Sequence, residues 1–470
     1  MSASWATESK PTPRQRAERG KAARAQAPRS TLAKLDLSGD RDPIALLQSQ
    51  DPSRLAELVP VRYGRMLASP FAFFRGAAVV MARDLASSPR SGLEVQLCGD
   101  AHLLNFGTFG SPERALAFDL NDFDETLPGP FEWDVKRMAA SFEVAGRDRG
   151  FTGSERRHAL LAAVRAYRES MHRFAAMRDL DVWYAHTDQG AVEAELRARN
   201  EGKLERRLRR SVAKALRNDD MRALQKLTYR IDGARRIISR RPPLIVPLAE
   251  LVQAGAPSDL EARLGDLFDL YRGTLQRDRR HLLDGFRYVD LARKVVGVGS
   301  VGTRCWIMLL QGRDQGDPLF LQIKEAQVSV LESELGASEF ANHGERVVEG
   351  QRLMQATSDI FLGWLHAEAG TDGRPGDYYV RRLRDWKGSV DVAKISPRGL
   401  VAYAELCGWT LARAHARSGD RIAIATYLGR GARFDHALAE FGSAYADLNE
   451  RDHAALERAV AAEVVRAENG

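Results

Sequence analysis

The stretch Arg293-Lys-Val-Val-Gly297-Val-Gly299-Ser300-Val-Gly302-Thr-Arg304 decides among the folds open to this chain. A run that includes two β-branched valines enters a Gly-x-Gly-x-x-Gly turn. Glycines in such a turn let backbone amide groups approach phosphate oxygens, because no Cβ atom stands in the way. The residues that follow the last glycine show which kind of phosphate-binding turn this is.

Three known folds use a glycine turn of this kind: a P-loop, a dinucleotide-binding unit and the glycine-rich lid of a kinase-like small lobe. A P-loop requires Lys and then Ser or Thr after its final glycine, but this chain has Thr303 and Arg304. A dinucleotide-binding unit requires a helix directly after the turn. Here residues 305–310 and 319–323 are rich in strand formers, and 312–318 are typical of a turn. This order favours an antiparallel lid with Gly297, Gly299, Ser300 and Gly302 as the candidate nucleotide-binding residues.

Lys324 follows the third predicted strand directly, so it is the candidate lysine for the nucleotide phosphates. An acidic partner is expected on the next helix, which we predict within 337–355. Glu345 and Glu349 lie one turn apart on that helix, and we assign the partner role to Glu349. The alternative is a strand-end lysine with an extended aliphatic stem and two solvated glutamates.

A second motif lies far upstream, in Cys98-Gly-Asp100-Ala-His-Leu-Leu-Asn105 and in Phe118-Asp119-Leu-Asn-Asp122. Phosphoryl transfer requires positioning and charge neutralisation, which a base and two oxygen ligands for magnesium provide. We therefore predict Asp100 as the base, with Asn105 and Asp119 as metal ligands and Asp122 in reserve. Asp and Asn are also common turn residues, so chance is the competing explanation of this spacing.

These stretches, together with 69–76 and 346–355, resemble an uncharacterised bacterial family, domain of unknown function 2252. That family is grouped with the protein-kinase-like superfamily, which includes aminoglycoside and choline phosphotransferases. The resemblance implies a two-lobed α+β fold with a helical large lobe and a small antiparallel-sheet lobe. It also implies that Asp134 braces the catalytic loop. Arg304 departs from the pattern, because protein kinases usually place a valine there, over the adenine.

The order of these parts differs from that of ordinary kinases, because the Asp100 loop precedes the glycine turn by some two hundred residues. The chain is therefore interpreted as circularly permuted. Residues 377–384 resemble the last small-lobe strand, and a helix follows whose apolar spacing predicts one buried face at Leu400, Tyr403, Ala404, Cys407, Leu411 and Ala414. We predict a disordered basic tail over 1–38, a first part of the large lobe over 39–285, the nucleotide-binding lobe over 286–390 and a helical return to the large lobe over 391–470.

The function predicted from these features is an ATP- and magnesium-dependent phosphotransferase that acts on a hydroxyl group of a small molecule or protein. Two alternatives stay open: transfer of AMP with the nucleotide reversed in the same cleft, and a non-catalytic regulator that binds nucleotide or RNA. Residues 203–241 are crowded with Arg and Lys, and the whole chain carries a net charge of +7. RNA is nevertheless the less favoured partner, because Tyr229 is nearly the only aromatic residue there for base stacking.

Composition agrees with a large enzyme, since 470 residues with 44% hydrophobic content can form two lobes. No apolar run approaches the length of a membrane span, and the N-terminal residues lack the apolar core of a signal peptide. Cys98, Cys305 and Cys407 have neither metal nor redox spacing, so we expect three buried thiols and a cytoplasmic location. Residues 152–155, Thr-Gly-Ser-Glu, predict a capping box that opens a helix.

Overall fold

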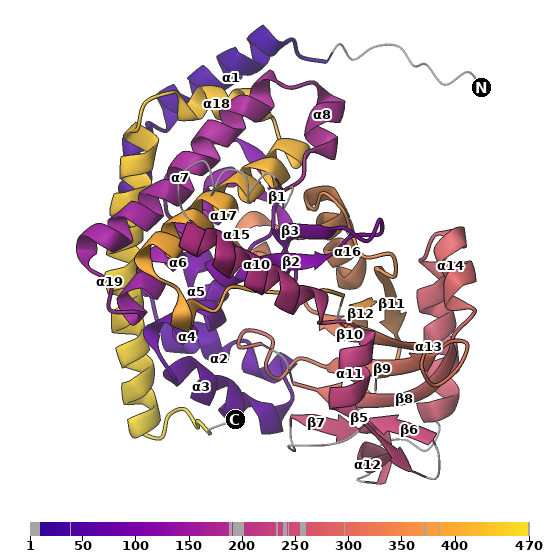
Figure 1. The fold of residues 1–470 in the computed structure, drawn as a ribbon. Helices are drawn as coiled ribbons and strands as arrows, with labels where there is room; N and C mark the ends of the chain where they lie inside the picture. Colours follow the sequence, from indigo (N-terminus) through magenta and orange to yellow (C-terminus); the bar gives the residue numbers. More distant parts are fainter. Residues whose placement is uncertain are drawn as a thin grey trace, which may run out of the picture.

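A helical lobe and a smaller lobe built on an antiparallel sheet make up the chain (Figure 1). The computed structural model describes residues 10–37, 39–187, 190, 202–231, 234–237, 242, 244–253, 260–295, 297–370, 373–383 and 385–468. The molecule is therefore a mixed α+β protein.

The helical lobe is assembled from the two ends of the chain. Its N-terminal helices are α1 (Pro13–Gln26), α2 (Pro43–Gln48), α3 (Val59–Leu67), α4 (Pro70–Gly76), α5 (Ala78–Ala86), α6 (Phe131–Asp148), α7 (Gly153–Ala176) and α8 (Asp179–Tyr184). Its C-terminal helices are α17 (Pro397–Ser418), α18 (Arg421–Leu428) and α19 (Arg433–Ala461). Two short antiparallel pairs lie among them: β1 (Glu94–Leu97) with β4 (Leu127–Pro130), and β2 (Phe106–Gly110) with β3 (Leu116–Leu120).

The smaller lobe contains a six-stranded antiparallel sheet in the order β11-β12-β10-β9-β8-β7. Its strands are β7 (Ile245–Pro247), β8 (Arg287–Lys294), β9 (Cys305–Gln311), β10 (Pro318–Ala326), β11 (Gly363–Ala367) and β12 (Gly376–Arg382). The helices of this lobe and of the segment leading to it are α10 (Gly202–Leu216), α11 (Asp220–Leu227), α12 (Leu248–Gln253), α13 (Leu260–Gly273), α14 (Arg277–Leu283), α15 (Glu332–Leu335) and α16 (His343–Met354). A hairpin of β5 (Thr228–Ile231) and β6 (Ala234–Ile237) adjoins the sheet.

The strands predicted around the glycine turn are confirmed. The turn joins β8 to β9, and β10 carries Lys324 opposite Cys305 on one side and Tyr379 on the other. The small lobe begins earlier than the predicted residue 286, because β7 pairs with β8 and α13 packs against the sheet. That edge strand is only three residues long, too short for its sequence to predict.

Two helices of the large lobe form as their sequences predict. The capping box of Thr152 and Glu155 opens α7, and each of the two side chains accepts a hydrogen bond from the other residue's backbone N–H. α17 packs against α7 and buries Leu400, Ala404 and Cys407 as predicted, whereas Tyr403 is half-buried. The three cysteines are free thiols and all are buried, as expected.

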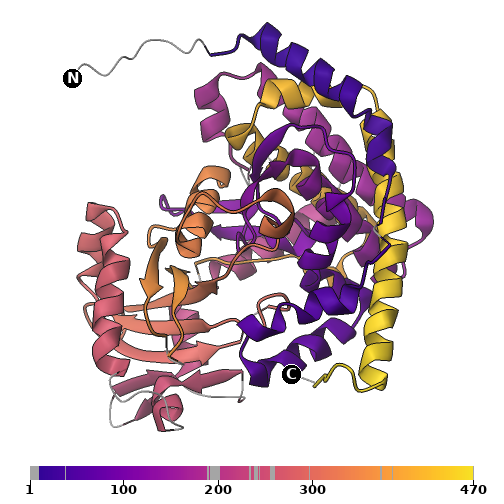
Figure 2. The same cartoon turned by 180° about the vertical axis from the view of Figure 1, so that it is seen from behind.

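The prediction of a disordered tail to residue 38 is wrong for residues 13–33, which form α1 and a short 3-10 helix. α1 lies along α18 (Figure 2). Gly20 approaches so closely that a Cβ atom there would lie 2.2 Å from the carbonyl oxygen of Ala423. Small residues thus let a polar helix pack tightly, although its composition is typical of disorder.

The basic segment 203–241 contains nearly all of α10, the whole of α11 and both strands of the adjoining hairpin, and several of its residues lie outside the described ranges. Among the described residues, no helix combines the length and the apolar character needed to cross a membrane.

Candidate functional site

A cleft of about 650 Å³ lies between the two lobes. The helical lobe contributes the loop that follows β1 and the residues that follow β3. The smaller lobe contributes the glycine turn, β10 and the linker that follows β12. The predicted site residues that line this cleft are Asp100, Asn105, Asp122, Gly297, Gly299, Ser300 and Lys324.

Helix α6 holds the loop that carries Asp100 in place. The carboxylate of Asp134 accepts hydrogen bonds from Cys98 N at 2.8 Å and Gly99 N at 3.1 Å, which confirms its predicted bracing role. Gly99 has φ +83°, and a Cβ atom there would lie 2.4 Å from the carbonyl oxygen of Glu125. This turn therefore requires glycine.

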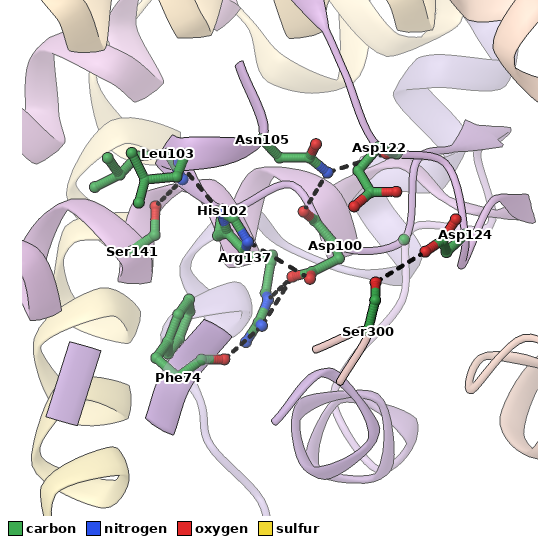
Figure 3. A network of polar contacts seen from close by, with 12 residues as sticks. Phe74, Asp100, His102, Leu103, Asn105, Asp122, Asp124, Arg137, Ser141 and Ser300 are labelled. Atoms are coloured by element: carbon green, nitrogen blue, oxygen red, sulfur yellow. Dashed lines mark hydrogen bonds and ion pairs between the residues drawn. The ribbon is translucent and has the colours of Figure 1, made fainter. Parts of the chain in front are cut away.

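Arg137 orients the carboxylate of Asp100 (Figure 3). Its Nε donates to Asp100 Oδ1 at 2.8 Å, and its Nη2 donates to the carbonyl oxygen of Phe74 at 2.7 Å. His102 Nε2 lies 3.7 Å from Asp100 Oδ2. Burial lowers the pKa of His102 to about 4, so at neutral pH this imidazole carries no charge. The carboxylate is thus fixed by one guanidinium group and faced by a neutral ring.

The side-chain amide of Asn105 differs in how its nitrogen and its oxygen are bonded. Its Nδ2 donates to the carbonyl oxygens of Asp100 at 2.9 Å and Asp122 at 3.0 Å, which fixes the orientation of the amide. Its Oδ1 is buried and has no hydrogen-bond partner among the described residues. A buried amide oxygen without a donor suits a hard cation such as magnesium.

The structure does not bring Asp119, the predicted metal ligand, to the cleft. Asp119 is 1% exposed and forms an ion pair with Arg413. It also accepts hydrogen bonds from Leu120 N and Ala356 N, each at 2.9 Å. Asp122 instead lies just beyond the end of β3, lines the cleft and has a 45% exposed side chain. Asp122 is therefore the better-placed carboxylate, and the assignment of Asp119 is corrected.

Lys324 is buried and its ammonium group meets two carboxylates. Its Nζ lies 2.6 Å from Asp124 Oδ2 and 3.5 Å from Asp122 Oδ1. Burial alone would lower the pKa of Lys324, but these two carboxylates outweigh it and raise that pKa well above its ordinary value. Asp124 also accepts hydrogen bonds from Tyr379 Oη at 2.6 Å and Ser300 Oγ at 3.3 Å.

The predicted pairing of Lys324 with Glu349 is corrected by these contacts. The carboxylate of Glu349 is 41% exposed and accepts a hydrogen bond from Arg352 at 2.7 Å. The α16 side chain that contacts the backbone beside the cleft is Arg346. It donates to the carbonyl oxygens of Thr126, Asp124 and Gln327. Glu345, the other predicted candidate, is one residue away from Arg346 and likewise has no contact with Lys324 in the described structure.

The glycine turn is anchored to the helical lobe. Arg54 donates to Gly299 O at 2.9 Å, Arg65 donates to Gly297 O at 2.6 Å, and Leu55 N donates to Gly302 O at 2.8 Å. Gly302 has φ +91°, and a Cβ atom there would lie 2.9 Å from the Cβ atom of Arg54. Arg304 points elsewhere, since it is buried in an ion pair with Glu325.

The motif analysis missed several groups that line the cleft, among them Asp124, Glu125 and Arg75. Asp124 could have been found, because it stands two residues after Asp122 in the same acidic stretch. Burial is the largest cause that raises the pKa of Glu125 to about 7. The Nε atom of Arg75 is buried and has no hydrogen-bond partner among the described residues. Arg75 lies in the stretch 69–76 that carries part of the family resemblance, but neither of the two motifs includes it.

The described residues contain no group of three or more His, Cys, Asp or Glu side chains placed to hold a metal ion. A magnesium ion here would therefore use Asn105 Oδ1 and Asp122 together with oxygens of a bound ligand. Magnesium commonly binds in this way, through one or two carboxylates and substrate phosphates.

Residues 54–459 match the family model described as Uncharacterized protein conserved in bacteria (DUF2252), and the chain belongs to this family. No curated protein and no solved structure matches the chain.

Proposed function

We propose that this member of the DUF2252 family is an ATP- and magnesium-dependent phosphotransferase that acts on a hydroxyl group. The observation that carries the proposal is one cleft lined by Asp100, Asn105, Asp122, Lys324 and a glycine turn, in which Asn105 Oδ1 has no hydrogen-bond partner among the described residues. These are the residue types that kinase-like enzymes use as base, metal ligands and phosphate-binding groups.

The order of elements supports a permuted kinase-like fold. The glycine turn, the lysine strand β10, helix α16, strands β11 and β12, and helix α17 follow one another along the chain. The end of α17 lies beside β1, since Gln96 N donates to Ser418 Oγ at 3.2 Å. A direct connection at that point would lead α17 into the Asp100 loop. The contact therefore supports a permutation of the order found in ordinary kinases.

The proposed reaction assigns each residue a defined task. The acceptor hydroxyl oxygen forms a bond to the γ-phosphorus of ATP, the bond from that phosphorus to the β-bridging oxygen breaks, and ADP leaves. Asp100 takes the hydroxyl proton, and Lys324 binds phosphate oxygens. When bound, magnesium would neutralise phosphate charge between Asn105 and Asp122.

Calorimetry of Mg-ATP binding tests this proposal. We expect Lys324→Ala and Asp122→Ala each to weaken binding about tenfold or more, because each removes a charged contact. Glu349→Ala is the matched control, since its carboxylate contacts Arg352 outside the cleft, and it should bind as the wild type does. A folded wild-type protein that binds no nucleotide with or without magnesium would overturn the proposal.

A further inference from the structure

The linker end of the cleft is crowded with positive charge. Arg381 of β12 and Lys387 of the linker line it from one side. The cleft is also lined by Lys214, Arg222, Lys226 and Lys294, and the junction of α10 and α11 contacts the linker, because Asn218 O accepts from Trp386 N and Asn218 Nδ2 donates to Lys387 O. Arg381 is the largest of the causes that lower the pKa of Lys387 to about 7, followed by burial; Asp122 raises this pKa, and Lys324 and Lys294 lower it further. Repulsion between these cations would be relieved by a bound anion.

The linker backbone is largely engaged in bonds to the protein itself. Trp386 N donates to Asn218 O at 2.8 Å, and Gly388 N donates to Thr108 O at 3.0 Å. The carbonyl oxygens also accept internal bonds: Asp385 O from Gly110 N, Lys387 O from Asn218 Nδ2 and Gly388 O from Thr108 N, each at 2.8 Å. A nucleotide base would need such N–H and C=O groups for recognition, and most of those described here are already used.

None of the described lining residues of the cleft is Phe, Tyr or Trp, and the imidazole of His102 lies beside Asp100 rather than at the linker. The apolar lining of the cleft comes mainly from segments other than the linker, namely Val79 of α5, Val298 of the glycine turn, and Val328 and Val330 after β10. Arg54 and Arg75 lie beside this apolar part of the wall, whereas the linker contributes Leu383 as its apolar lining residue together with Lys387.

We infer that the linker end of this cleft binds a phosphate-bearing group rather than a nucleotide base. The inference deepens the proposed function and rests on it for the identity of the cleft as a nucleotide site. The phosphates have two sources, the nucleotide's own triphosphate or a phosphorylated acceptor.

Calorimetry with inorganic tripolyphosphate as the probe tests this inference. We expect wild-type protein to bind tripolyphosphate, and the Lys214→Ala/Lys387→Ala double variant to bind it at least about tenfold more weakly, because charge-assisted contacts are lost. Lys394→Ala is the control, because Lys394 is 84% exposed, pairs with Asp391 and does not line the cleft. Circular dichroism verifies that all variants fold.

Competition experiments separate the two sources. If tripolyphosphate and Mg-ATP exclude each other, and the double variant weakens both, the linker end holds the nucleotide's phosphates. If both bind together, it holds a phosphorylated acceptor. Either result supports the inference. Tripolyphosphate binding that is absent, or that the double variant leaves unchanged, overturns it. Continued Lys324-dependent binding of Mg-ATP in that case would leave the proposed phosphotransferase function standing.

Discussion

The two oxygens of the Asp100 carboxylate have different surroundings. Oδ1 is held by Arg137 at 2.8 Å, whereas Oδ2 lies 3.7 Å from His102 Nε2. Because Arg137 also bonds to Phe74 O, it cannot follow Asp100 away from this position without losing a second contact. In the proposed reaction, Oδ2 is therefore the oxygen that takes the proton.

Asp100→Asn should separate catalysis from binding. The amide cannot act as a base, so we expect turnover to fall by roughly a hundred- to ten-thousand-fold while the Kd for Mg-ATP stays nearly unchanged. Single-turnover rates and calorimetry on the same preparation measure both quantities. Asp391→Asn, at an exposed position paired with Lys394, is the matched control. Equal loss of binding and turnover would assign Asp100 to the architecture of the cleft instead.

Glu125 should make the stability of the protein depend on pH. Its pKa is raised to about 7 in the folded state, against 4.5 ordinarily, mainly because of burial. The folded state therefore binds this proton more tightly than the unfolded state, so the stabilisation is complete below pH 4.5 and is lost as pH rises through 7. We expect Glu125→Gln to be more stable than wild type at pH 8, by about 2–3 kcal/mol, with little difference at pH 4.5. Urea unfolding at both pH values checks this, and a pH-independent difference would contradict it.

The residue types of the site were predictable, but not all of their positions were. Asp100, Asn105 and Lys324 follow from motif spacing and do line the cleft. The prediction that Asp119 is a metal ligand of the cleft does not hold, because Asp119 is still within β3, opposite Gly107. Its side chain pairs with Arg413 inside the helical lobe. Where β3 ends, and hence which of two nearby aspartates leaves the strand, depends on its pairing with β2.

At the scale of elements, the glycine turn is less free than its sequence implies. Three residues of the segment 54–65 bond to its carbonyl groups. The turn therefore joins the two lobes directly as well as covering the cleft.

Gly302→Ala should destabilise this junction. An alanine there would adopt a left-handed backbone conformation, which costs about 1–2 kcal/mol, and its Cβ atom would press on Arg54. We expect lower thermal stability by differential scanning calorimetry. Gly299→Ala is the control, because its φ is not positive and the nearest atom to the added Cβ is 3.4 Å away. Equal effects of the two substitutions would show that the conformation of Gly302 is not the cause.

Helix α16 shows that sequence periodicity does not predict how a helix is rotated about its own axis. Its existence was predicted, and Glu345 and Glu349 do share a face. The helix is turned so that Arg346, Val347 and Gly350 are buried, which leaves the two glutamates outside. Rotation of a helix about its axis is set by packing against its neighbours, here β11, β12 and α17. A single sequence predicts which residues share a face but leaves open which polar face meets the site.

At the scale of the whole molecule, the N-terminal segment packs against the last third of the chain. Arg16 pairs with Asp420 at 2.8 Å, and Arg24 donates to Tyr427 O at 3.1 Å. The C-terminal end returns to the same lobe, where Glu468 N donates to Pro60 O. Long-range contacts of this kind follow from the fold and are invisible to local composition, which is why α1 was predicted as disordered.

Removing the contacts of α1 should lower the stability of the whole protein. We expect Arg16→Ala/Arg24→Ala to lose about 1–2 kcal/mol and a few degrees of Tm, because two contacts to α18 disappear. Arg14→Ala is the control, since that side chain is 90% exposed and pairs only within its own helix among the described residues. An unchanged Tm in the double variant would show that α1 docks without stabilising the lobe.

Asp124 has a wider consequence for how this cleft responds to its ligands. One carboxylate receives Lys324 from the sheet, Tyr379 from the neighbouring strand and Ser300 from the glycine turn. A phosphate that binds Lys324 must displace the carboxylate of Asp124, which already neutralises the lysine. In the ligand-free protein, Asp124 therefore competes with the phosphate for Lys324. If Lys324 moves away, the hydrogen bond between Asp124 and Ser300 changes as well. Ligand binding at Lys324 would thus alter the contacts of the glycine turn through the shared side chain of Asp124.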